Sequence, residues 1–127
     1  MKEVAVVSYC RTGIARATRG ALNQTHGIPM AAHVMREAVS RAKIEAAEIE
    51  DVILGCAMPE AEQGMNVARI CALRAGVPDS VPAMTINRFC SSGLNAVSIA
   101  ADRIRTGEAD IMIAAGTESM SMIPMPR

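Results

Sequence analysis

The sequence predicts an α/β fold in which a parallel sheet carries helices on both faces, in the order β-α-β-α-β-α-β. Short apolar runs alternate with longer segments in which apolar residues recur at helical spacing. Continuous apolar runs are typical of parallel strands, which are buried on both faces. Parallel strands also need long crossovers, which the helical segments provide. With 127 residues and no repeat or linker before Gly116, one domain is expected.

Four apolar runs are expected to form the strands. They are VAVVSY at 4–9, DVILGC at 51–56, VPAMTINRF at 81–89 and ADIMIAA at 109–115. Residues 11–28 are polar and interrupted by glycines, so we expect a loop there, and an acidic turn is expected at 45–50.

Three helices are expected between the strands. They span about 29–43, 65–75 and 91–105. In the first, apolar residues starting at Ala31 recur at i, i+3, i+4, i+7, i+8 and i+11, and Pro29 suits the first turn. Gly76 and Gly107 follow the second and third helices at positions that end helices.

The third predicted helix has an unusual surface. Over 91–101 it reads SSGLNAVSIAA, with no charge and with small residues on all sides. A helix that is apolar or small all round is buried all round, and one sheet covers only one side of it. We therefore expect the other side to be covered by something outside these 127 residues.

Composition argues against several classes of function. Thirteen basic residues balance thirteen acidic ones without a charged block, and Tyr9 and Phe89 are the only aromatic residues, so no nucleic-acid partner is expected. No apolar run approaches the ~20 residues of a membrane span, and the N-terminus is too short and too acidic for a secretory signal. The two histidines are expected to be surface residues without a catalytic role, His26 in the loop and His33 on the first helix.

The cysteines are widely spaced and form no C-x-x-C pair. They are Cys10, Cys56, Cys71 and Cys90. With the histidines they lack metal-ligand spacing, so no metal is expected. The wide spacing of the cysteines indicates free thiols in a reducing, cytoplasmic compartment. Cys10 and Cys56 end predicted strands and Cys71 lies on the inner face of a helix, so these three are expected to serve packing.

Cys90 is the candidate nucleophile. It lies in NRFCSSGLNA at 87–96, where the third predicted strand leads into the third helix. The free amides and dipole of a helix start favour negative charge, and the thiolate is the reactive form of cysteine. Ser91, Ser92 and Gly93 would let a substrate approach the sulfur. On position alone, a buried and inert cysteine is an equally good interpretation.

Two long motifs resemble signatures of the thiolase family. NRFCSSGLNA resembles the family's nucleophile motif, and GTESMS at 116–121 resembles the next signature, about one helix and one strand downstream. RTG at 11–13 resembles the opening Arg-Thr turn, although Gly13 stands where many members have Pro or Ala, and QGMNVAR at 63–69 matches a further stretch. The order and spacing agree over nearly the whole chain, which is thus identified as a member of the thiolase family.

The resemblance implies a thiolase-like fold of which this chain is an incomplete half. Residues 1–120 would be the first part of the N-terminal domain, and 121–127 the start of the substrate-binding loop region. In the family, two similar halves pack their nucleophile-type helices together between two sheets. A further strand joins the sheet only after the loop region.

The resemblance also implies an acyltransferase that cleaves 3-ketoacyl-CoA to acetyl-CoA and a shortened acyl-CoA, or runs the reverse condensation. Cys90 would attack the keto carbon and carry the acyl group as a thioester, with its backbone N–H in the oxyanion hole. No bound cofactor is implied. Coenzyme A would be the cosubstrate, acyl-CoA and CoA the ligands, and a homo-oligomer, dimer or tetramer, the assembly of the complete protein.

The family's further catalytic groups are absent from this sequence. Its activating histidine, second cysteine and water-positioning asparagine lie in Gly-His-Pro, Cys-x-Gly and Asn-Glu-Ala motifs, and none of these occurs here. We therefore expect the 127-residue segment alone to be inactive. Two alternatives remain: a ketoacyl-synthase-type condensing enzyme with the same nucleophile turn, and a non-catalytic thiolase-like lipid-binding module.

Overall fold

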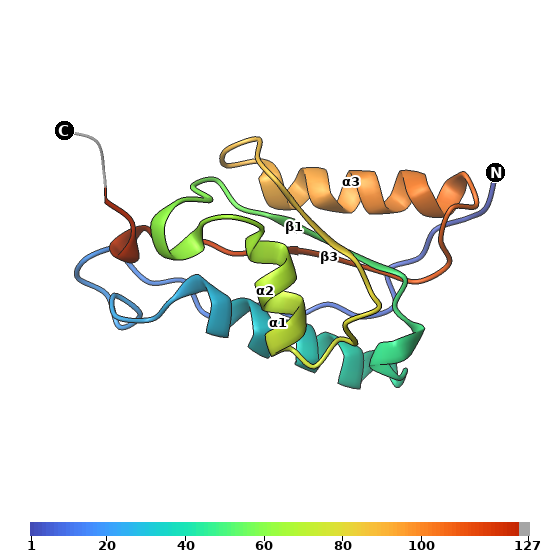
Figure 1. The fold of residues 1–127 in the computed structure, drawn as a ribbon, viewed down its shortest axis with the longest axis horizontal. Coiled ribbons are helices and arrows are strands. Elements are labelled where there is room, and N and C mark those ends of the chain that lie inside the picture. Colours follow the sequence, from blue (N-terminus) through green and yellow to red (C-terminus); the bar gives the residue numbers. More distant parts are fainter. Residues whose placement is uncertain (125–127) are drawn as a thin grey trace.

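A three-stranded parallel sheet forms the centre of the structure, a computed structural model that describes residues 1–124 (Figure 1). Its strands are β1 (Asp51–Gly55), β2 (Ala83–Ile86) and β3 (Met112–Gly116), in the order β2-β1-β3. Both pairings of the central strand are parallel, with Val52 opposite Ala83 on one side and Ile113 on the other. Every residue of β1 is buried, as the continuous apolar run predicts.

Helices cover both faces of this sheet, which confirms the predicted layers. They are α1 (Gly27–Ala42), α2 (Val67–Arg74) and α3 (Ser92–Arg105). In Figure 1, α3 lies along one face while α1 and α2 lie on the other. Short 3₁₀ turns at Ala46–Glu48, Ala61–Gln63 and Met120–Met122 fill the connections. Three of the four predicted strands are thus present, at boundaries shifted by at most three residues.

Helix α1 shows how the sequence pattern becomes packing. Ala31 and Met35 are buried against the layer formed by β1 and α2, whereas His33 is exposed as expected. Lys43 caps the end of the helix: it adopts the left-handed conformation (φ 57°) and donates its backbone N–H to the carbonyl of Ser40. The core on this side of the sheet is completed by side chains from β1 and α2: Val52, Leu54, Val67, Ala68, Cys71 and Ala72.

The strand predicted at 4–9 is not formed. Residues 1–16 have no regular secondary structure, and the side chains of Val6, Val7 and Tyr9 are more than 70% exposed. The segment is held by α1 instead: the Ser8 hydroxyl donates to the carbonyl of Ala38 (2.8 Å), and the Cys10 thiol lies 3.1 Å from the carbonyl of Val34. A strand exists only when a neighbour satisfies its backbone groups, and no strand lies beside this segment in the part of the chain described.

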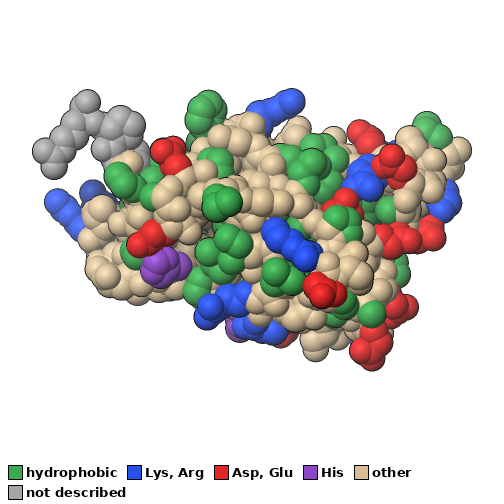
Figure 2. All heavy atoms as spheres, viewed as in Figure 1, with side chains coloured by type: hydrophobic (Ala, Val, Ile, Leu, Met, Phe, Trp, Pro, Cys, Tyr) green, Lys and Arg blue, Asp and Glu red, His purple; other side chains and the backbone are tan. Residues whose placement is uncertain are grey.

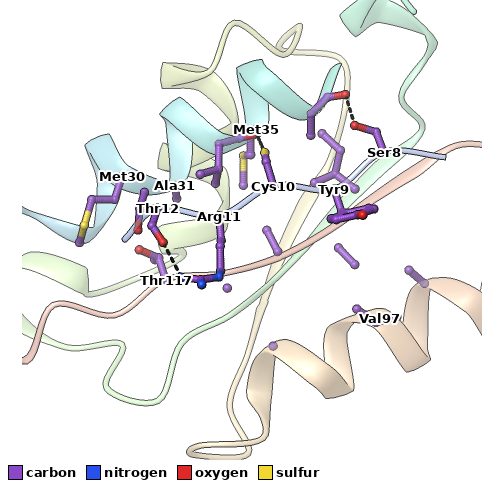
Figure 3. Close-up of a pocket in the computed structure, with 18 of the residues that line it drawn as sticks. Ser8, Tyr9, Cys10, Arg11, Thr12, Met30, Ala31, Met35, Val97 and Thr117 are labelled. Atoms are coloured by element: carbon purple, nitrogen blue, oxygen red, sulfur yellow. Dashed lines mark hydrogen bonds between the residues drawn. The ribbon is translucent and has the colours of Figure 1, made fainter. Parts of the chain in front are cut away.

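A groove of about 870 Å³ lies where the missing neighbour would be. It runs between residues 4–17 and the outer edge of β3, and α1 and α3 contribute its remaining walls. In the close-up, Tyr9 and Cys10 come from the N-terminal segment while Val97 faces them from α3 (Figure 3). The β3 edge is therefore an open pairing edge among the residues that the structure describes.

Helix α3 is covered on one side only by the described residues. Ser92, Ala96 and Ala100 are buried against the sheet, but the side chains of Leu94 and Val97 are 76% and 45% exposed. This agrees with the expectation that a charge-free helix needs a second cover. On the face drawn in Figure 2, apolar side chains lie among basic and acidic ones, with no large patch of one charge.

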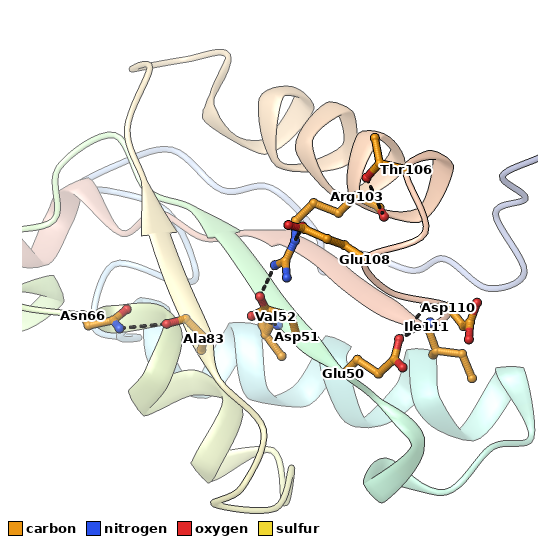
Figure 4. A network of polar contacts seen from close by, with 10 residues as sticks. All are labelled: Glu50, Asp51, Val52, Asn66, Ala83, Arg103, Thr106, Glu108, Asp110 and Ile111. Carbon is orange, nitrogen blue, oxygen red and sulfur yellow. Dashed lines mark hydrogen bonds and ion pairs between the residues drawn. The ribbon is translucent and has the colours of Figure 1, made fainter. Parts of the chain in front are cut away.

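A polar network connects the C-terminal end of α3 with the start of β1 (Figure 4). The buried carboxylate of Asp51 pairs with Arg103 and also accepts the backbone N–H of Val52 (2.7 Å). Arg103 extends the network to Glu108 (Nε to Oε2, 2.6 Å). Hydrogen bonding to Asp51 raises the pKa of the Arg103 guanidinium, which favours its charged form. These contacts have a structural role, because they satisfy polar groups at the amino end of the sheet.

We expect the 127-residue chain alone to self-associate or to melt without clear cooperativity. Its open β3 edge, exposed valines and half-covered α3 present pairing and apolar surfaces to other chains. Size-exclusion chromatography and thermal melting, with a dye that binds apolar surface, would measure this. A compact monomer with a sharp melt and no dye binding would contradict the expectation.

Candidate active site

Cys90 lies in the turn between β2 and α3, two residues before the helix begins. It is exposed, and its thiol is free. The buried alternative that position alone left open is therefore wrong. The described residues form no hydrogen bond with its backbone N–H. The turn thus presents a sulfur and an unpaired N–H donor side by side.

The turn has a strained conformation just before the cysteine. Phe89 has φ 47°, which is uncommon for a bulky residue, and its ring is 70% exposed. The Asn87 side chain accepts the backbone N–H of Phe89 (2.8 Å), and the Ser91 hydroxyl donates to the carbonyl of Arg88 (2.9 Å). Side chains within the motif therefore take up the backbone groups that a sharp turn leaves without helix or sheet partners.

Two strand ends press against the start of α3. A Cβ atom on Gly55, the last residue of β1, would lie 2.4 Å from the carbonyl carbon of Ser92. A Cβ on Gly116, the last residue of β3, would lie 3.4 Å from the Cα of Gly93. Only glycine at position 55 permits this approach. The contact fixes Cys90 at the carboxyl edge of the parallel sheet, the edge at which ligands bind in open α/β sheets.

A polar cluster lies at the same edge, and the sequence did not predict a role for its members. The Glu118 carboxylate accepts the side-chain amide of Gln63 (2.6 Å) and the backbone N–H of Ala57 (2.7 Å). Gln63 is 1% exposed, and its side-chain oxygen accepts the backbone N–H of Ser119 (2.7 Å). The cluster joins the loops after β1 and β3. The only available signal was the presence of Gln63 and Glu118 in two of the family-like motifs.

The two histidines lie at the surface, as predicted. His26 precedes α1, and its Nδ1 lies 2.8 Å from Glu62, with both side chains nearly half exposed. His33 is exposed on α1. Neither is a hydrogen-bond partner of Cys90 in the described structure. No group of three or more His, Cys, Asp and Glu side chains within residues 1–124 could hold a metal ion. Nor does this part contain a helix long and apolar enough to cross a membrane.

The other cysteines differ from Cys90 in their surroundings. Burial and the nearby Glu118 carboxylate raise the pKa of the Cys56 thiol to about 11. Burial, with Cys56 as a neighbour, raises the pKa of the Cys71 thiol to about 12. Both are part of the core, as the packing interpretation predicts. Cys10 is half-buried, with its thiol directed at a carbonyl of α1.

These differences predict selective alkylation. At pH 8 we expect iodoacetamide to modify Cys90 at least about ten times faster than Cys56 or Cys71, because buried thiols with raised pKa hold little thiolate. Their raised pKa means that folding favours the protonated thiol. That contribution to stability is complete below the reference pKa of 9.0 and is lost as pH rises through about 11 and 12.

Protection of both core cysteines should therefore weaken above pH 9.0. Peptide mass spectrometry after timed labelling would measure the four rates, and labelling in denaturant provides the control in which all four react. Equal rates for Cys90 and Cys71 in native buffer would show that the core is not formed as described.

The fold and this site define a class: α/β proteins with an exposed cysteine on a strand-to-helix turn at the carboxyl edge of a parallel sheet. Comparison with known proteins narrows the class. The family model "Thiolase, N-terminal domain" matches residues 4–127. The chain belongs to the thiolase family.

Individual relatives agree with this assignment. A 3-ketoacyl-CoA thiolase of Bacillus subtilis is 46% identical over 125 residues, 98% of this chain and 32% of the relative. An acetyl-CoA acetyltransferase of Syntrophomonas wolfei is 46% identical over 123 residues, which are 97% of this chain and 31% of that relative. The crystal structure of the Bacillus anthracis acetyl-CoA acetyltransferase superposes with a TM-score of 0.88 at 37% identity, over 96% of this chain and 30% of that one. The chain therefore spans about a third of the length of these relatives.

Proposed function

We propose that this chain is the nucleophile-bearing part of a thiolase. The complete enzyme would cleave 3-ketoacyl-CoA with CoA, or condense two acyl-CoA molecules in reverse. Residues 1–120 would form the first part of its N-terminal domain, and 121–127 would begin the substrate-binding loop region. Residues 125–127 of that loop region lie outside the described structure. The observation that carries the proposal is an exposed Cys90 on the strand-to-helix turn of a chain that belongs to the thiolase family.

In the proposed cleavage, the Cys90 thiolate adds to the 3-keto carbon of the substrate. The bond between C2 and C3 then breaks, and its electron pair stays on C2 of the departing acetyl-CoA, which takes up a proton. The acyl group remains on Sγ as a thioester. The thiolate of a second CoA attacks that thioester and releases Cys90. Covalent catalysis of this kind divides one difficult step into two easier ones.

The backbone N–H of Cys90 would donate to the oxygen that becomes negative in both steps. Its lack of an acceptor among the described residues supports this role, because an oxyanion hole requires a donor that is not already engaged. Proton transfers to C2 and from CoA need an acid and a base. The histidines within this chain are engaged with Glu62 or exposed on α1, so these groups would come from other parts of the enzyme.

The names of the relatives favour a thiolase over a ketoacyl-synthase-type condensing enzyme. A non-catalytic lipid-binding module would have no use for an exposed thiol beside a free N–H. The ligands of the complete enzyme would be acyl-CoA and CoA as cosubstrate. A homo-oligomer, dimer or tetramer, is proposed from membership of the thiolase family. A reducing, cytoplasmic compartment is proposed from four free cysteines.

A chimera tests the function. Residues 1–127 of this chain would replace the matching third of the Bacillus subtilis 3-ketoacyl-CoA thiolase, which supplies the remaining two thirds. We expect the chimera to cleave acetoacetyl-CoA only when CoA is present, and to carry an acyl group on Cys90 when acyl-CoA is added without CoA. An acyl group on another cysteine, or a folded chimera with neither reaction, would contradict the proposal.

A further inference from the structure

Ser92 stands out among the polar residues around Cys90, because its side chain is buried although it lies beside an exposed turn. It is the first residue of α3 and is 3% exposed. Its hydroxyl accepts the backbone N–H of Arg88 (2.8 Å) and donates to the carbonyl of Phe89 (2.6 Å). One hydroxyl therefore connects the helix to both residues that precede the cysteine.

These hydrogen bonds stabilise the backbone conformation of Phe89, which side-chain packing does not stabilise. Phe89 adopts φ 47° while its ring is 70% exposed, so side-chain burial contributes little to keeping it there. What fixes Phe89 is hydrogen bonding: its N–H goes to Asn87, and its carbonyl accepts from the hydroxyl and from the backbone N–H of Ser92 (3.0 Å). Because Phe89 directly precedes Cys90, its backbone angles set the direction of the cysteine's N–H.

Ser92 is itself held firmly. Its backbone packs so closely against Gly55 that a Cβ atom on residue 55 would overlap the backbone of Ser92. Gly55 is in turn the end of the fully buried β1, and its carbonyl accepts the backbone N–H of Thr117 (3.1 Å). A chain of contacts thus runs from the sheet through Gly55 and Ser92 to Phe89, and ends at Cys90.

We propose that Ser92 is a positioning residue for Cys90: its hydroxyl fixes the turn so that the thiolate and N–H of Cys90 meet the substrate in the orientation that the reaction needs. The inference rests on the proposed thiolase function. Ser91 provides the matched comparison. It has the same side chain one residue earlier, but it is exposed and makes a single bond to the carbonyl of Arg88.

The test compares Ser92→Ala with Ser91→Ala in the chimera with the Bacillus subtilis thiolase. We expect Ser92→Ala to lower kcat by about 10- to 100-fold, the size expected when reacting groups are misplaced by up to an ångström. KM for acetoacetyl-CoA should change less than about threefold, since uniform substrate binding is untouched. Ser91→Ala should change kcat less than about threefold. The melting temperature of each variant identifies effects of simple unfolding.

Amide hydrogen exchange provides a readout that does not depend on activity. Loss of the Ser92 hydroxyl should speed exchange at the Arg88 amide at least about tenfold relative to Ser91→Ala, because it removes the only acceptor described for that amide. Unchanged exchange would overturn the proposed contact. Faster exchange with unchanged kcat would overturn the positioning role. An unmutated chimera that folds but neither cleaves nor becomes acylated would overturn the proposed function, and with it the catalytic part of this inference, while the exchange result still decides whether Ser92 holds the turn.

Discussion

Replacing Cys90 by serine in the chimera is expected to lower kcat by about four to six orders of magnitude, the loss that removal of a catalytic nucleophile causes in other covalent enzymes. Oxygen replaces sulfur with little change in volume, but a serine hydroxyl keeps its proton at any pH at which the enzyme works. Cys90 is exposed, so the melting temperature should be unchanged. The measurement is thiolytic cleavage of acetoacetyl-CoA, followed at the absorbance of its enolate.

The core cysteines provide the control. Cys71→Ser puts a hydroxyl into a fully buried site on α2 and should cost about 1–3 kcal/mol of stability. Its effect on kcat should be small as long as the chimera stays folded. Retention of more than a hundredth of the activity in Cys90→Ser, or its loss in folded Cys71→Ser, would assign the nucleophile to another residue.

The 127-residue chain alone is expected to show no thiolase turnover, although iodoacetamide should still modify Cys90. Its turnover should lie at least about three orders of magnitude below that of the chimera, because residues 1–124 place no acid or base at the sulfur. His26 is paired with Glu62 and His33 points outward from α1. Both proteins would be assayed at the same concentration of Cys90 thiol. Comparable rates would mean that a base within these residues has been missed.

The central layers could be predicted because their signals are local. The apolar run of β1 and the periodic spacing in α1 each determine their own burial. The charge-free stretch at 91–101 correctly indicated a helix with more apolar surface than its sheet can cover. The placement of Cys90 also followed from local signals, since strand and helix patterns meet at that residue.

The features that the sequence did not predict have a common cause: each depends on contacts with residues that are distant in the sequence. Residues 4–9 have a strand-like sequence, but a strand also requires a neighbour, and the sequence of the segment carries no information about one. Arg69 on α2 donates to the carbonyls of Asp79 and Val81, contacts that the helical pattern of α2 does not predict. Gln63 and Glu118 are 55 positions apart, so nothing short of the folded structure brings them together.

The glycine contact beneath the turn has a consequence for substrate selectivity. Because Gly55 leaves no space under Ser92 and Gly93, the turn cannot yield to make room for a longer acyl chain. Apart from its chain neighbours and its own helix backbone, Gly93 has no atom within 4 Å of where a Cβ would lie, so the other described residues form no wall at that point. In the proposed thiolase, a nucleophile on such a rigid and open turn would not by itself discriminate between short and long acyl chains. The choice of acyl length would then be made by surfaces that the rest of the proposed enzyme places over this turn, and it should be transferable by exchanging those surfaces while residues 87–93 are left unchanged.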